Sequence, residues 1–359
     1  MRDKAMLKRF DAWAQQGPFT SLDLGIYRIL YSFCTLCILG DITWVAELPD
    51  SLYSPPLGVF QLLAGFPSST LLIALEIARA VALVLLGLGL WTRTMSFAVA
   101  ILLAASFGMT YSVGKIGHTI LLVMTPLVLS FADWGHRLSI DSMRNPSSSK
   151  GSKQTQWPLR LLALIVGLAF LAAAGAKLVT GWLEFSTQAT QGFFLRDYYI
   201  GGQSATLTQV GLGISNRLAW ESLDWLTVII EFAILASVPW WKAFRITLAL
   251  ATCFHLGVLL VFGIGFPNVI AYGAFVAWGA AATFIRIPRN RVQPVLFLVY
   301  AVIILAGFAS IWIVVVQHAE IPYFFRVWTI YAGAAFGVTY LLTVVASWAR
   351  APKRAAGHG

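Results

Sequence analysis

The sequence predicts an all-α membrane protein, a polytopic bundle of about ten transmembrane helices (range about 8–10) with both termini in the cytoplasm. Three observations predict this fold class. The composition is 58% hydrophobic and only 11% charged, whereas a soluble domain carries about a quarter charged residues. Apolar runs of about 20 residues, the length that crosses a bilayer, recur along the whole chain. The alternation over about ten residues that is typical of membrane β-barrels is absent from the sequence.

The basic residues indicate how this bundle is oriented. When the chain is divided into ten spans, 18 of its 25 Lys and Arg residues fall on one side and five on the other, while Arg28 and Arg79 lie inside spans. This bias follows the positive-inside rule and places both termini on the cytoplasmic side. The net charge of +10 therefore indicates topology and contact with anionic lipids, and we expect no nucleic-acid partner.

The individual elements follow from the apolar runs and the polar breaks between them. Residues 1–20 predict an amphipathic cytoplasmic surface helix, because Leu7, Phe10 and Trp13 recur at helical spacing among basic residues. Residues 132–156 form a polar cytoplasmic loop rich in Ser, Gly and Lys, which marks the clearest internal boundary. The predicted spans are residues 22–45, 71–91, 95–113, 115–131, 159–177, 225–239, 246–262, 269–285, 292–316 and 327–348.

Two segments that we expect on the outer side are not predicted to span the membrane. Residues 47–69 contain Pro55, Pro56 and Pro67 and only a short apolar piece, so we expect an interfacial or re-entrant segment. Residues 178–222 are too polar to span the membrane and too aromatic for a plain linker. Structureless loops of this length are uncommon, so we expect this segment to fold back over the outer face of the bundle as a lid.

The candidate intramembrane polar set consists of Arg28, Glu76, Arg79, His118, Lys177, Glu231 and His255. Buried charges are costly in a membrane, so we expect Arg28 to pair with an acid and Glu76 to pair with Arg79 or with Arg28. Lys177 is either an interfacial anchor or a functional amine, and with His118 it falls toward the outer face, where one pocket can hold both. The three cysteines are expected to be buried small side chains, and no spacing of His, Cys or acidic residues fits a metal site.

Four stretches of the sequence carry a resemblance to a known family. They are RILYSFCTLCILGDI (28–42), GKIGHTILLVMTPLVLSFADWGHRLSID (114–141), AGAKLVTGWL (174–183) and FHLGVLLVFGIGFPNVIAY (254–272). In this order and spacing, over about residues 21–280, the chain resembles the vitamin K-dependent γ-carboxylase family and the bacterial membrane proteins grouped with it as the horizontally transferred transmembrane (HTTM) family. On this resemblance the chain divides into the surface helix (1–20), a carboxylase-like transmembrane core (21–285) and two additional helices with a basic tail (286–359).

The resemblance implies a quinol-dependent reaction that uses a lysine as base. In the γ-carboxylases a lysine deprotonates a reduced naphthoquinone, which takes up oxygen and becomes a strong base. That base removes a proton from a glutamate side chain, CO2 is added, and the quinone leaves as an epoxide. In this register Lys177 corresponds to the catalytic base and His118 to the histidine that assists it. The residues on the implied quinone-binding side are His255, Phe262, Phe266 and Trp182.

The cofactor implied by the resemblance is a reduced quinone, either a vitamin K-type naphthoquinone or menaquinone, with O2 and CO2 as co-substrates. The implied partners are the lipid bilayer, this lipid-soluble quinone and a peptide or small acidic substrate on the outer face. The implied location is the bacterial plasma (inner) membrane. The chain departs from the family in having one lysine, Lys177, where the family has two, and two additional spans in place of a large lumenal domain.

The same residues also permit a non-enzymatic function, so the sequence alone leaves the enzyme assignment uncertain. A proton-coupled transporter or an accessory subunit on this scaffold would use Glu76, Glu231 and the two intramembrane histidines as a proton relay. The two functions make different demands. The enzyme requires the amine of Lys177, whereas the relay requires the carboxyl group of Glu231.

Overall fold

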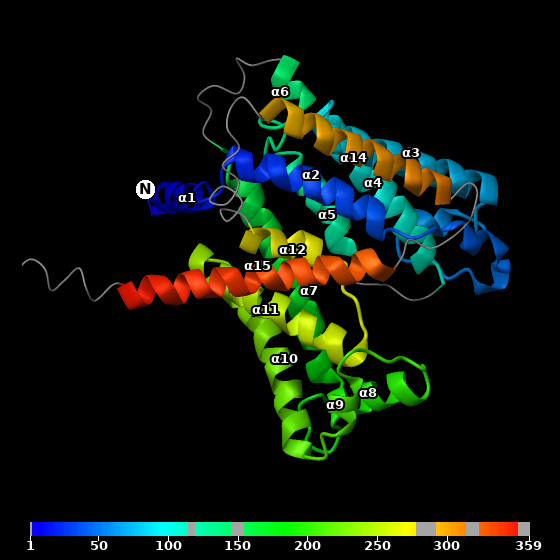
Figure 1. Cartoon of the computed structure of the whole chain (residues 1–359), viewed down its shortest axis with the longest axis vertical. Coiled ribbons are helices and arrows are strands. Elements are labelled where there is room, and N and C mark those ends of the chain that lie inside the picture. Colours follow the sequence, from blue (N-terminus) through cyan, green and yellow to red (C-terminus); the bar gives the residue numbers. More distant parts are fainter. Residues whose placement is uncertain (1, 114–118, 145–153, 278–291, 314–322, 351–359) are drawn as a thin grey trace, which may run out of the picture. The chain divides into compact units, whose positions relative to one another are not determined.

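The computed structural model describes residues 2–113, 119–144, 154–277, 292–313 and 323–350 (Figure 1). Regular secondary structure in these residues is helical, apart from one isolated bridge between Ser54 and Val113. The α-helices are α1 (Arg2–Ala14), α2 (Ser21–Ile38), α3 (Ser69–Leu88), α4 (Thr92–Tyr111), α5 (Ile120–Leu129), α6 (Ile140–Arg144), α7 (Trp157–Val179), α8 (Ala189–Tyr199), α9 (Thr208–Leu212), α10 (Arg217–Ser237), α11 (Trp241–Phe262), α12 (Val269–Ala277), α14 (Val292–Trp312) and α15 (Tyr323–Arg350). The predicted all-α class is confirmed.

Seven helical segments of the described chain are long and apolar enough to cross a membrane, which indicates a multi-pass membrane protein. They are Ser21–Glu47, Ser69–Leu88, Thr92–Tyr111, Trp157–Val179, Trp241–Phe262, Val295–Trp312 and Phe324–Ala349. Helix α10 has 21 residues, but Glu221, Asp224 and Glu231 make it more polar than these seven. Helices α5 and α12 adjoin residues outside the described ranges. The total of ten spans and the orientation of the termini therefore stay predictions.

The chain forms two compact units. The first unit comprises Met1–Leu162 and Ala281–Phe325, and the second comprises Ala163–Ala280 and Arg326–Gly359. The two last long helices therefore belong to different units, α14 to the first and almost all of α15 to the second. Because this division rests on compactness, the predicted segments 1–20, 21–285 and 286–359 stay predictions.

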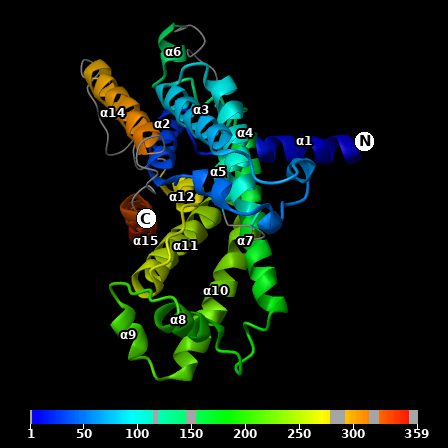
Figure 2. The ribbon, with the colours of Figure 1, turned by 90° about the vertical axis from the view of Figure 1, so that its right-hand side faces the viewer.

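In the first unit, α3 and α4 pack against α2, α5 and α14 (Figures 1 and 2). Helix α2 begins with a capping box, in which the Thr20 hydroxyl accepts from the backbone N–H of Asp23 and the Asp23 carboxylate accepts from the N–H of Thr20. Helix α3 ends at Gly89, whose φ of 70° is left-handed. A Cβ at Gly89 would lie 2.8 Å from the Cζ of Arg28. Both the left-handed φ and this close contact therefore require glycine at this helix end.

The segment that was expected to be interfacial or re-entrant is ordered around short 3-10 turns. It docks through Phe60, whose ring packs against Gly108 of α4 and whose carbonyl accepts from the Tyr53 hydroxyl at 2.6 Å. Leu48 and Phe66 are also partly buried against the core, whereas Leu57, Val59 and Leu62 are exposed at 91%, 70% and 85%. One docked side and one exposed apolar side are compatible with the interfacial position, which stays a prediction.

In the second unit, α10 and α11 form an antiparallel hairpin, and the hydroxyls of Ser237 and Thr247 are hydrogen-bonded at 2.8 Å near its tight turn. Helix α15 packs on α11 and α12 through glycines: a Cβ on Gly337 would lie 2.9 Å from the backbone oxygen of Ala249. Helix α10 begins at Arg217, although the predicted span begins at residue 225. Glu221 and Asp224 lower the hydropathy of the first turns of α10, which are nevertheless helical and capped by Asn216. The span at residues 225–239 stays a prediction.

The predicted lid segment, residues 178–222, folds mainly into α8, α9 and the first turn of α10. Two hydrogen bonds to backbone carbonyls connect it to the end of α11. The N–H of Leu207 donates to the carbonyl of Leu260 at 2.7 Å, and the Thr208 hydroxyl donates to the carbonyl of Val261 at 3.1 Å. Figure 2 shows α8 and α9 beside the ends of α10 and α11. The segment thus covers one end of the second unit, and its placement on the outer face of a membrane stays a prediction.

Candidate functional site

Lys177 in the last turn of α7 forms an ion pair with Glu231 of α10. Its Nζ lies 2.7 Å from Oε1 and 2.8 Å from Oε2 of Glu231. Only 18% of the lysine side chain and 11% of the glutamate side chain are exposed. Lys177 is therefore an interior amine, and a carboxylate that holds it with both oxygens fixes its position.

The local sequence explains why an aromatic ring lies beside this amine. Helix α7 ends in a Schellman arrangement, in which Gly181 has a φ of 76° and the N–H of Trp182 donates to the carbonyl of Lys177 at 3.1 Å. This turn brings the Trp182 ring to 5.4 Å from Nζ of Lys177, and the Phe193 ring of α8 packs on the indole at 5.5 Å. A tryptophan face attracts a cation and excludes water on that side of the pair.

A second buried polar pair joins α11 to α12. Nδ1 of His255 and the hydroxyl of Tyr272 are hydrogen-bonded at 2.6 Å, with His255 8% and Tyr272 1% exposed. Aromatic rings surround the imidazole: Phe266 lies at 4.5 Å, Phe254 at 5.7 Å and Phe170 of α7 at 6.1 Å between ring centroids. The break between α11 and α12 makes this arrangement possible, because it returns the chain to the level of His255.

The two polar pairs lie at nearly the same level of the second unit. Ser237 and Thr247 face each other across the α10–α11 hairpin. Glu231 lies six residues before Ser237 and His255 eight residues after Thr247, which is about 9 Å and 12 Å at a rise of about 1.5 Å per residue. Their heights thus differ by less than one helical turn.

The structure places the predicted site residues as follows. The Nζ of Lys177 lies over the Trp182 ring, and the His255 and Phe266 rings are in contact. Phe262 is directed elsewhere: its ring lies 5.5 Å from Phe194 of α8, in the packing that holds the predicted lid segment. His118 lies outside the described residues, so its proximity to Lys177 stays a prediction.

Two partners in this site were not among the predicted site residues. The sequence assigned Glu231 only to the alternative proton relay and not to the enzyme site, and its pairing with Lys177 joins residues 54 positions apart. Tyr272 lies within the fourth resembling stretch, and nothing in its spacing from His255 indicates a contact. Helix spacing predicts contacts along one helix, whereas both of these contacts connect different helices.

In the first unit, Arg28 is fully buried and its guanidinium donates to backbone carbonyls. The acceptors are the carbonyls of Trp134 at 3.0 Å, Arg137 at 3.4 Å, Leu138, and Gly87 of α3 at 3.5 Å. The expectation that Arg28 pairs with an acid is therefore wrong for the described part of the chain. A planar fork of N–H donors suits several converging carbonyls, so Arg28 fastens the loop after α5 to α3.

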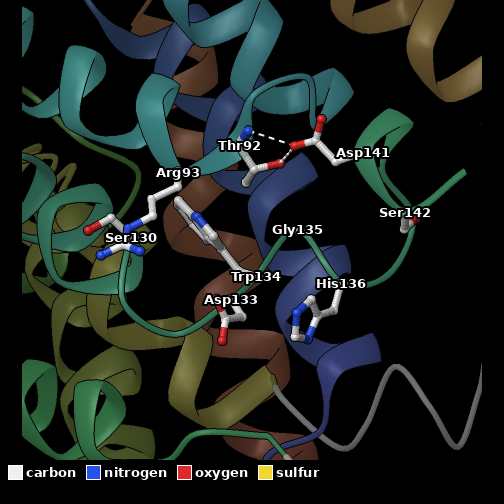
Figure 3. A pocket seen from close by; sticks show the side chains of 9 residues that line it. All are labelled: Thr92, Arg93, Ser130, Asp133, Trp134, Gly135, His136, Asp141 and Ser142. Atoms are coloured by element: carbon white, nitrogen blue, oxygen red, sulfur yellow. Dashed lines mark hydrogen bonds between the residues drawn. The ribbon is translucent and has the colours of Figure 1, made fainter. Parts of the chain in front are cut away.

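The same loop is fastened to α4 around a small cavity of about 190 Å³ (Figure 3). Asp141 caps α4, because its carboxylate accepts from the backbone N–H groups of Trp91 at 3.0 Å and Thr92 at 2.7 Å. Trp134, also on the cavity wall, donates its indole N–H to the Ser96 hydroxyl at 2.9 Å. The polar atoms in these contacts serve helix ends and loop backbone. We therefore assign the SFADWGHRLSID stretch a structural role.

A buried ion pair of the first unit lies within one helix. Glu76 and Arg79 form a buried ion pair on adjacent turns of α3, and Arg79 also donates to the carbonyl of Gly40 at 3.3 Å. Of the two expected pairings, Glu76 with Arg79 is confirmed. These residues thus neutralise each other and fasten the end of α2 to α3.

No protein-family model, curated protein or solved structure matches the chain.

Proposed function

We propose that this multi-pass membrane protein is an enzyme in which Lys177 acts as the base on a reduced, lipid-soluble quinone, as the resemblance to the γ-carboxylases implies. The observation that supports the proposal is the Lys177–Glu231 pair, with both oxygens of the carboxylate within 2.8 Å of Nζ. An ammonium ion cannot accept a proton. Lys177 becomes a base only if another group takes its proton, and Glu231 is in contact to do so.

The surroundings of the pair favour such a transfer. When a proton moves from the Nζ of Lys177 to a Glu231 oxygen, an N–H bond breaks, an O–H bond forms, and two charges become two neutral groups. The hydrogen bond is kept, and neutral groups cost less than charged ones in an apolar environment. The amine lone pair can then accept the proton of an acidic hydroxyl group brought beside it.

The residues around His255 are of the kind that would bind the implied quinone. Phe170, Phe266 and Tyr272 surround the imidazole with aromatic rings, which suit a flat apolar ring system, and the imidazole and phenol are groups that hydrogen-bond to a quinone oxygen. When bound, the reduced quinone supplies the electrons for the reaction with O2. The chain itself would orient the ring through these residues, exclude water and remove the proton at Lys177.

The test uses purified protein in nanodiscs, supplied with a reduced vitamin K-type naphthoquinone and O2, and quantifies quinone epoxide by mass spectrometry. We expect epoxide from the wild type and none from Lys177→Arg, because arginine can keep the ion pair with Glu231 but does not give up its proton. Lys242→Ala is the matched control: Lys242 also lies over a tryptophan, Trp348, at 5.2 Å in the same unit, and we expect full activity. Absence of epoxide from folded wild type, or unchanged activity in Lys177→Arg, would overturn the proposal.

A proton-coupled transporter is the second candidate, and it is favoured by the position of Glu231 and His255 at one level of one helical unit. This function predicts proton flux into proteoliposomes without any quinone. The flux should disappear in Glu231→Gln. Flux of this kind, together with no epoxide from the wild type, would replace the enzyme by the transporter.

A further inference from the structure

The buried face of α10 is unusually polar for a helix between other helices. Its buried residues are Trp220, Asp224, Thr227, Val228, Glu231, Ile234 and Ser237. Asp224, Thr227 and Glu231 follow each other at spacings of three and four residues, so they form one line along this face. We infer that this line is a proton relay that connects the Lys177–Glu231 pair with the end of the second unit at Glu221.

Asp224 is the central group of the relay. It is fully buried, and its Oδ1 accepts from the backbone N–H of Thr190 at 2.8 Å and from the Thr190 hydroxyl at 2.5 Å. Its Oδ2 is also buried and has no hydrogen-bond partner in the described part of the chain. A buried carboxylate oxygen without a donor is costly. Oδ2 can therefore receive a proton without giving up a hydrogen bond, and can then donate it.

Glu221 connects this line of residues to solvent. It lies one turn before Asp224 on α10 and is only partly buried. Its Oε2 accepts from the side-chain amide of Gln188 at 3.2 Å, and Gln188 is two residues before Thr190, the partner of Asp224. A partly exposed carboxyl group one turn from a buried one is suited to take protons from water and pass them inward.

Thr227 fills the interval between the two buried acids. Asp224 and Glu231 are seven residues apart, about 10 Å along the helix at about 1.5 Å per residue, which is too far for one direct transfer. The hydroxyl of Thr227 lies between them and donates to the carbonyl of Leu223 at 2.7 Å, so its oxygen can still accept. One or two water molecules beside Thr227 would complete the path.

Two titratable groups of neighbouring helices lie at the inner end of this line. They are Lys177 of α7, which holds Glu231, and His255 of α11, at the level of Glu231. Of these, Lys177 is the group in direct contact with the line. The relay rests on the proposed function for its purpose, because a base that removes one proton per turnover must return that proton to solvent.

The relay is tested without quinone, by the rate at which Glu231 takes up a proton after an acid pH jump. Time-resolved infrared spectroscopy follows the carboxylic C=O stretch in nanodiscs, and Glu231→Gln assigns the band. We expect Asp224→Asn to slow uptake by about tenfold or more, because asparagine can accept the two Thr190 bonds but cannot pass a proton. Thr227→Val should also slow uptake. Asp197→Asn, which removes the acid of the Arg196–Asp197 ion pair on α8, should leave the rate unchanged.

The outcomes separate the relay from the proposed function. Uptake within about twofold of wild type in both Asp224→Asn and Thr227→Val would overturn the relay, whatever the epoxide assay shows. Slowed uptake in both variants with no epoxide from the wild type would support the relay and overturn the enzyme. If Asp224→Asn does not fold, Thr227→Val alone decides, since it removes a hydroxyl and no charge.

Discussion

Replacing Lys177 and Glu231 singly and together should reveal a strong coupling between them in the free energy of unfolding. Removing one member of a buried ion pair costs about 3–5 kcal/mol, because the other charge is left without a partner. With 18% and 11% of the two side chains exposed, we expect each single change, Lys177→Met or Glu231→Gln, to cost about 2–3 kcal/mol. The double variant leaves two neutral side chains of similar size, and we expect it within about 1 kcal/mol of wild type.

The double-mutant cycle should therefore show a coupling of about 3–5 kcal/mol between the two positions. The measurement is reversible unfolding in mixed micelles, followed by circular dichroism for the four proteins of the cycle. Arg196 and Asp197 on α8 provide the control cycle, because this pair is 2.6 Å long but 54% of the arginine side chain is exposed. We expect a coupling below about 1 kcal/mol there. Additive costs at Lys177 and Glu231 would refute the view that these residues form one buried unit.

Three further predictions concern single positions. Gly89→Ala should destabilise the protein by about 2–4 kcal/mol in thermal unfolding, because Gly89 has a left-handed φ and an added Cβ would contact Arg28. Gly175→Ala is the control: an added Cβ there has no atom within 4 Å, and we expect it to stabilise the protein by up to about 1 kcal/mol. Arg28→Lys should cost about 2–3 kcal/mol in chemical unfolding, since an ammonium cannot reach all the carbonyls that the guanidinium holds, and a wild-type midpoint would contradict this. Tyr272→Phe should cost about 1 kcal/mol and shift the imidazole NMR signals of His255; unchanged signals would show that the hydrogen bond is absent in solution.

Most long helices could be predicted from the sequence because a membrane span is defined by the length of its apolar run. The predicted span at residues 159–177 corresponds to α7 (Trp157–Val179), and the one at residues 246–262 to α11 (Trp241–Phe262). At α10 the predicted span, residues 225–239, covers only the later part of the helix. There the polar residues recur with a helical period, which hydropathy averaged over a window does not detect.

The candidate site could be predicted only in part. Lys177 and His255 stood out because ionisable groups in apolar stretches are rare, and both are buried at one level of the second unit. Their partners could not be predicted in the same way. The contact between Lys177 and Glu231 depends on the relative height of α7 and α10, which is set by close packing such as that of Gly167 on Leu235, and no local pattern in the sequence records that height.

The resembling stretches fall into two physical classes, and the distinction decides where chemistry can occur. Arg28 and Asp141 bind mainly backbone groups, whose protonation does not change, so their contacts can only hold helices and loops together. Lys177 and Glu231 bind each other, and moving one proton between them converts two charges into two neutral groups without moving the helices. Reactivity requires a pair of the second kind. The GHRLSID stretch therefore has a structural role, whereas the proposed activity depends on whether the amine of the AGAKLVTGW stretch can exchange its proton.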